Sequence, residues 1–248
     1  MLLLLSGEGP SDMGQAQRVK PCCETTEFNH GPLCLMLDKL IESFHGLQYS
    51  LLSSHQVFFT AKQQLVDTVK TDQPRRMRLP GKKHGKEITY YYKNALALAK
   101  LAQALAAEQQ QKVLAVLFRD ADGTASSERG EWQQKLQSMH DGFASANYAE
   151  LGVPMLAKPK SEAWLICALK TQPYQHCDAL EQRSGNDYSP NSLKAELASL
   201  VGDTSASALA ELVRSGRIDP EQIDMPSFEQ FKKQFTQALQ HAVSAGEY

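Results

Sequence analysis

Three short runs of apolar residues are the clearest pattern along the chain. They lie at residues 2–6, 113–118 and 153–157, and each is followed by a polar segment that contains acidic side chains. Continuous apolar runs of this length are typical of parallel strands that are covered on both faces. The pattern therefore predicts a central parallel sheet.

Apolar residues at helical spacing mark several segments between and after these runs. They recur every three or four positions from Leu33 to Phe44, and residues 94–110 are rich in Ala, Leu and Gln without Gly or Pro. Another helix is expected at residues 127–144. A last helix has one apolar face and a capping box made by Ser227 and Gln230; that face comprises Phe228, Phe231, Phe235, Leu239 and Ala242.

The segment from residue 55 to residue 92 is harder to assign. Residues 57–59 resemble a strand and residues 62–69 a helix, and the boundary between them stays open. A basic cluster follows around Pro80-Gly81, which favours an exposed loop; its members are Arg75, Arg76, Arg78, Lys82, Lys83 and Lys86. With Tyr90, Tyr91 and Tyr92 close by, this segment is either a solvated loop or a surface that grips phosphates and stacks on bases.

Composition and charge narrow the classes of protein. Hydrophobic residues make up 42% and charged residues 22% of 248 residues, which is typical of a globular chain. The formal net charge of -2 gives no overall attraction to polyanions, so any contact with nucleic acid must be local. The five cysteines include no Cys-x-x-Cys pair, and we expect reduced thiols. Without a membrane span or a basic segment before the first leucines, we expect a cytoplasmic protein with no membrane contact.

Acidic residues follow each predicted strand. Glu8 and Asp12 come after the first, Asp120 and Asp122 after the second, and Glu162 after the third. The carboxyl ends of parallel strands meet at one edge of a sheet, so these side chains are expected to converge. Carboxylate oxygens are the ligands that Mg²⁺ or Mn²⁺ prefers.

A metal site at this edge predicts the hydrolysis of phosphodiester bonds. Glu8, Asp120 and Asp122 would form its catalytic centre, and a lysine would neutralise charge on the phosphate. Lys158 and Lys160 are both placed for that role in the sequence. The residues do not choose between DNA and RNA, including transfer RNA.

Two motifs carry a family resemblance. Leu-Leu-Ser-Gly-Glu8-Gly-Pro-Ser-Asp12 and Leu-Phe-Arg-Asp120-Ala-Asp122-Gly resemble the paired signature of TOPRIM domains. Together with Lys-Pro-Lys-Ser-Glu162-Ala-Trp-Leu and Gly-Asn-Asp-Tyr-Ser-Pro, they are similar to small stand-alone OLD-like TOPRIM proteins, which are often encoded beside an ABC-type ATPase. The resemblance covers roughly residues 1–200.

The resemblance implies an α/β fold with a TOPRIM-like Rossmannoid parallel sheet flanked by helices. It places the catalytic domain at residues 1–170 and a helical extension at 171–248. The 112 residues between Glu8 and Asp120 (120 minus 8) exceed what a compact TOPRIM core needs, so an insertion is expected at about 15–95.

In function, the resemblance implies a metal-dependent nuclease. Glu8, Asp12, Asp120, Asp122 and Glu162 fall on the family's acidic positions. The resemblance also implies an ABC-type ATPase as partner and a role in anti-phage defence, with self-association into a homo-oligomer left open.

Two other interpretations remain. In the first, Asp120-Ala-Asp122-Gly-Thr124 also resembles the loop of haloacid-dehalogenase-type phosphatases, in which Asp120 would be the nucleophile. That interpretation leaves Glu8 without a role. In the second, the chain is a non-catalytic subunit that binds a partner through its helical tail.

Overall fold

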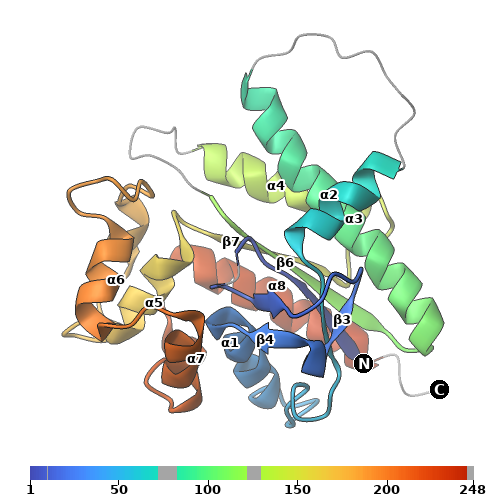
Figure 1. Cartoon of the computed structure of the whole chain (residues 1–248), viewed down its shortest axis with the longest axis horizontal. Coiled ribbons are helices and arrows are strands. Elements are labelled where there is room, and N and C mark those ends of the chain that lie inside the picture. Colours follow the sequence, from blue (N-terminus) through green and yellow to red (C-terminus); the bar gives the residue numbers. More distant parts are fainter. Residues whose placement is uncertain (10, 72–82, 122–129, 245–248) are drawn as a thin grey trace.

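The computed structural model of the chain describes residues 1–9, 11–71, 83–121 and 130–244, with side chains described outside residues 68–87 and 122–130. A mostly parallel five-stranded sheet lies at its centre, in the order β3-β5-β1-β6-β7 (Figure 1). The three predicted strands are confirmed as β1 (Leu2–Ser6), β6 (Val113–Asp120) and β7 (Gly152–Ala157). β5 (Val57–Phe59) is also parallel, and β3 (Cys23–Glu24) pairs with it antiparallel at the edge.

Helices cover both faces of the sheet, which explains the uninterrupted apolar strands. On one face, α1 (Pro32–Glu42) and α8 (Pro226–Ser244) pack with the side chains of Leu3 and Leu5. On the other, α3 (Lys83–Gln109) and α4 (Gly130–Ala144) pack with Leu2 and Leu4, and α2 (Lys62–Thr71) adds Leu65. Alternate residues of a strand point to opposite faces, so each strand needs apolar side chains throughout. The α/β class expected from the sequence is confirmed.

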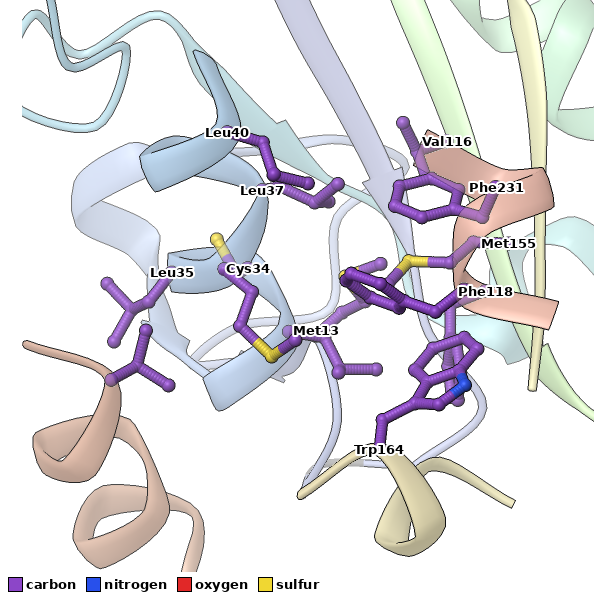
Figure 2. Packing of buried hydrophobic residues seen from close by; sticks show 14 of the residues in the cluster. Met13, Cys34, Leu35, Leu37, Leu40, Val116, Phe118, Met155, Trp164 and Phe231 are labelled. Carbon is purple, nitrogen blue, oxygen red and sulfur yellow. The ribbon is translucent and has the colours of Figure 1, made fainter. Parts of the chain in front are cut away.

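The larger core lies between the sheet and α1, α5 and α8. Figure 2 shows Phe118 and Met155 of the sheet between Met13 and Cys34 on one side and Phe231 on the other. Trp164, which is fully buried, contacts Phe118 edge-on, with ring centroids 6.2 Å apart, and Phe228 at 5.0 Å. The predicted apolar face of the last helix is therefore confirmed as part of the core.

Shorter elements complete the fold. β2 (Gly14–Ala16) and β4 (Phe28–His30) form a separate antiparallel pair, and α5 (Ser161–Leu169) begins four residues after β7. The remaining described elements are α6 (Leu193–Val201), α7 (Ala206–Arg214) and three 3₁₀ helices, η1 (Thr25–Glu27), η2 (Asp178–Gln182) and η3 (Pro220–Gln222).

The predicted insertion and extension both supply parts of the main fold. The range 15–95 contains α1, α2, the start of α3, and the sheet strands β3 and β5. The described residues of the range 171–248 include the helices α6, α7 and α8, and α8 packs directly against the sheet (Figure 1).

Three local expectations need correction. Lys83 and Lys86 lie in the first turns of α3, not in a loop, while Arg75, Arg76, Arg78 and Lys82 fall outside the described residues. α3 begins at Lys83, upstream of its predicted start, because burial of Tyr91 in the core favours helix there despite residues of modest helix propensity. Cys167 and Cys177, expected as reduced thiols, form a disulfide, because α5 and the loop that follows it bring them together; Cys22, Cys23 and Cys34 are free.

The expected capping box of the last helix also differs. α8 begins at Pro226, so Ser227 lies inside its first turn and its hydroxyl accepts a hydrogen bond from the Trp164 indole at 3.0 Å. The buried carboxylate of Glu181 accepts a hydrogen bond from the Ser227 backbone N–H at 2.7 Å. Glu181, which is distant in the sequence, therefore caps the first turn of α8.

The connections after β1 and β6 diverge at the carboxyl edge of the sheet. These adjacent strands are followed by α1 and α4, which lie on opposite faces. Where neighbouring strands send their connections to opposite faces, the loops separate, and ligands bind there in open α/β sheets. In the part of the chain that is described, none of the helices combines the length and apolar character needed to cross a membrane.

We expect Glu181→Ala to lower the free energy of unfolding by about 1–3 kcal/mol, because it leaves the first turn of α8 without its cap. Urea unfolding at neutral pH measures the change. The exposed Glu150 provides a matched control, and Glu150→Ala should stay within about 0.5 kcal/mol of the unsubstituted protein. Equal losses in both variants would contradict the capping role.

Candidate metal centre

The loop after β1 carries Glu8 and Asp12 to the carboxyl edge of the sheet. It folds back on itself, since the Gly9 amide donates to Asp12 Oδ2 at 3.0 Å. The start of α1 packs closely against this loop: a Cβ on Gly31 would lie 2.1 Å from the Asp12 carbonyl oxygen. A residue without a side chain is therefore required at position 31 to hold Asp12 in place.

Glu8 reaches across to the end of β6. Its Oε2 accepts the backbone N–H of Asp120 at 3.0 Å, and its Oε1 accepts Lys62 Nζ at 2.9 Å. Burial raises the pKa of Glu8, but Lys62, the Asp120 amide and the nearby Arg119 outweigh it, so the pKa lies below its ordinary value. Glu8 is therefore a carboxylate at neutral pH, and it contacts the second acidic motif as the sequence predicts.

Ser161 links two of the other acidic residues. It is the first residue of α5, and its backbone N–H donates to Asp120 Oδ1 at 2.9 Å. Its hydroxyl donates to Asp12 Oδ1 at 3.4 Å. Backbone N–H groups in the first turn of a helix are free to bind anions, so α5 stabilises the negative charge of Asp120.

Asp12 and Glu162 are the acidic side chains with the least compensation. Burial raises the pKa of Asp12 to about 6, and the charges of Glu162 and Glu8 add to the effect. Glu162 Oε2 is buried and has no hydrogen-bond partner among the described residues. This part of the site has more negative charge than the described side chains neutralise.

Two cations that sequence reasoning missed lie at the same edge. Arg119 is fully buried and donates to the carbonyl oxygen of Gly7 at 2.9 Å and to Asn94 Oδ1 at 2.6 Å. Tyr90 lies between the two cations, with its ring 5.3 Å from Lys62 Nζ and 5.8 Å from the Arg119 guanidinium carbon. The sequence carries a signal for Arg119, because this basic residue directly follows the apolar run 113–118.

The two predicted lysines have other partners. Lys158 Nζ lies 3.9 Å from Glu181 Oε2, and Lys160 Nζ lies 3.0 Å from Asp187 Oδ1. The basic side chain that contacts Glu8 comes instead from Lys62, at the start of α2. Asp122 lies outside the described residues.

The tyrosines near the basic cluster are held by the fold. Tyr91 is buried, and its hydroxyl donates to the Asp120 carbonyl oxygen at 2.9 Å, while Tyr92 donates to Ser145 at 3.0 Å. Of the two interpretations left open for this segment, stacking on bases does not apply to Tyr91, because α3 directs that ring into the core. Its bond helps to position the end of β6.

The residues present suit a hard divalent cation, although they are not arranged as a finished site. Within the described ranges, no three His, Cys, Asp or Glu side chains are grouped closely enough to hold a metal ion as they stand. The donors are nevertheless carboxylate oxygens, which Mg²⁺ and Mn²⁺ prefer. The raised pKa of Asp12 and the unpartnered oxygen of Glu162 both indicate that a cation would be stabilising here.

We expect Asp12→Asn to stabilise the protein at pH 7 in the presence of a chelator. The pKa of Asp12 is raised to about 6 from 3.8, so its contribution to stability is present below pH 3.8 and is lost as the pH rises through 6. Removing the charge should therefore raise the free energy of unfolding by about 1–3 kcal/mol at pH 7, with little change near pH 3.5.

Urea unfolding at the two pH values measures this prediction. Asp224→Asn, which changes an exposed aspartate, is the matched control and should have no such pH-dependent effect. A loss of stability at pH 7 on Asp12→Asn would show that its hydrogen bonds outweigh the repulsion.

Comparisons of the chain find no matching family model, no matching curated protein and no matching solved structure. The description of this edge therefore depends on the residues of the chain itself. They show an α/β fold with a mostly parallel sheet and a cluster of linked carboxylates at its carboxyl end.

Proposed function

We propose that the chain is a metal-dependent nuclease that cleaves phosphodiester bonds in DNA or RNA with Mg²⁺ or Mn²⁺. The observation that supports it best is the linkage of three separate acidic segments at one edge. Glu8 accepts the Asp120 amide, and Ser161 donates to both Asp120 and Asp12. Segments so far apart in sequence meet because their strands are parallel neighbours.

The acidic residues provide the ligands in this proposal. Glu8, Asp12, Asp120 and Glu162 would hold the cation, with Asp122 as a further ligand from outside the described residues. When bound, a divalent cation supplies Lewis-acid activation of the phosphodiester and of the attacking water. The carboxylates together repel anions, so an anionic substrate enters the site only when a cation is bound there.

We assign to Lys62 the neutralisation of charge on the phosphate that is cleaved. Lys62 is paired with Glu8 at the carboxyl edge of the sheet. Its side chain is 38% exposed, so it is accessible to a substrate. Burial lowers the pKa of Lys62. The hydrogen bond to Glu8 and the nearby Tyr90 hydroxyl raise it by more than burial lowers it, so the pKa lies above its usual value. Lys62 therefore stays protonated and is able to neutralise charge that develops on a phosphate.

Arg119 has a supporting role in the same proposal. Its guanidinium is fixed by backbone and amide oxygens rather than by a carboxylate. Its positive charge adds to the lowering of the pKa of Glu8. It thus keeps Glu8 ionised without occupying a carboxylate oxygen that a cation needs.

The proposal includes a broader biological role. The resemblance of the Glu8 and Asp120 motifs to OLD-like TOPRIM proteins supports an effector of anti-phage defence with an ABC-type ATPase as partner. No contact in the described residues bears on that partner.

We expect the purified protein to cleave plasmid DNA or RNA with Mg²⁺ or Mn²⁺ and to be inactive in chelator. Glu8→Gln and Asp120→Asn should each lower the rate by about a thousandfold or more, because each removes a ligand while leaving the shape of the side chain. Glu150→Gln, which removes an exposed carboxylate, is the control and should cleave at the unsubstituted rate.

Other results of this assay would favour the alternatives. A phosphoenzyme trapped on Asp120, with monoester hydrolysis but no strand cleavage, would support the phosphatase interpretation. Inactivity on every nucleic acid and with both metals, together with no calorimetric binding of Mn²⁺, would reject the nuclease and favour a non-catalytic subunit.

We expect Lys62→Met to lower kcat by about tenfold to a thousandfold, with a smaller loss in Lys62→Arg, because the positive charge is needed near the phosphate. Steady-state cleavage of a labelled strand measures it. Lys158→Met and Lys160→Met remove lysines that are paired with Glu181 and Asp187, and we expect smaller losses from them. If either of these two had the larger effect, the assignment of Lys62 would be wrong.

A further inference from the structure

A pocket of about 450 Å³ adjoins the carboxylate site. Glu8 and Lys62 line it, so it opens directly beside the proposed point of cleavage. Its other walls are β2 with the residues that follow it to Lys20, and the junction between β5 and α2. The volume lies within the range of about 300–1,000 Å³ that is usual for small-molecule sites.

The walls combine apolar surface with amide groups. Phe59, Ala16 and Ala61 provide the apolar part, and Phe59 is held by stacking on Phe28, with centroids 5.1 Å apart and planes at 18°. The amides come from four glutamines, Gln15, Gln17, Gln63 and Gln64. Apolar surface with amide donors and acceptors is the chemistry that binds a nucleic-acid base, by its face and by its edge.

The charge of the lining favours an anion. Three of its residues are basic, Arg18, Lys20 and Lys62, against one acidic residue, Glu8. Lys20 is paired with Glu27 and Lys62 with Glu8, whereas Arg18 has no ion pair among the described residues. Arg18 is exposed at the rim, where it is able to contact a phosphate.

We propose that this pocket binds one unpaired nucleotide of single-stranded nucleic acid, beside the phosphate that is cleaved. The proposal rests on the nuclease function. The base would lie against Phe59 and the two alanines, with its edge towards the glutamines and a flanking phosphate on Arg18. A paired base in a duplex is stacked on both faces and cannot enter a recess of this kind without leaving its partner.

Binding in chelator tests the proposal without cleavage. Fluorescence anisotropy would compare a short fluorescein-labelled single strand, as DNA and as RNA, with its duplex and with an abasic strand of the same length. We expect the single strand to bind about tenfold more tightly than the duplex or the abasic strand, since a stacked base contributes on that scale. The DNA and RNA strands show which sugar the pocket accepts.

Variants assign the binding to this pocket. Arg18→Glu should weaken single-strand binding by about tenfold, whereas Arg217→Glu, the same charge change at an exposed arginine outside the lining, should leave it within about twofold. Ala61→Trp should fill the pocket and remove the preference for strands that carry bases. Near-ultraviolet circular dichroism checks its folding, and Arg18→Glu provides the test if that variant does not fold.

Equal affinity for the abasic and the unmodified strand would overturn the proposal, as would equal effects of the two arginine substitutions. The outcome is separate from that of the nuclease assay. Binding with the expected preferences but without cleavage in Mg²⁺ or Mn²⁺ would reject the nuclease and retain the pocket. Cleavage by a protein whose pocket variants bind normally would reject the pocket alone.

Discussion

The parallel pairing of β1 with β6 is the constraint on which the candidate site depends. Its register places Ser6 opposite Leu117, so Glu8, which follows β1, meets Asp120, the last residue of β6, across the edge. The register is fixed because both faces of both strands are buried, and a shift by one residue would move every side chain of a strand to the opposite face. The packing of leucines and valines at the centre therefore sets the positions of carboxylates at the rim.

The sequence predicts this arrangement well where the information is local. The apolar runs identify β1, β6 and β7, and the general behaviour of parallel sheets then brings Glu8 and Asp120 to one edge. Lys62 could not be identified in this way, because the segment around it gave no clear boundary and its partner lies 54 residues away. Lys158 and Lys160 are nearer to Glu162 in sequence, but other carboxylates hold them.

Other misjudged details share a physical cause, which is that tertiary partners replace local ones. Ser227 and Gln230 have the spacing of a capping box, yet the cap comes from Glu181 because α8 begins at Pro226. Likewise, spacing does not reveal that Cys167 and Cys177 lie together once α5 and its loop have folded. In both cases the deciding contact joins residues that meet only once the chain has folded, Glu181 with Ser227 and Cys167 with Cys177.

The bond between the Trp164 indole and Ser227 extends the effect of the C-terminal helix to the site. Trp164 lies three residues after Ser161, within the helix whose first amide binds Asp120. Any attempt to isolate a minimal catalytic fragment by ending the chain before Pro226 would remove the Phe228 ring and the Ser227 hydroxyl that hold Trp164. The acidic cluster would then lose its alignment even though every one of its own residues was still present.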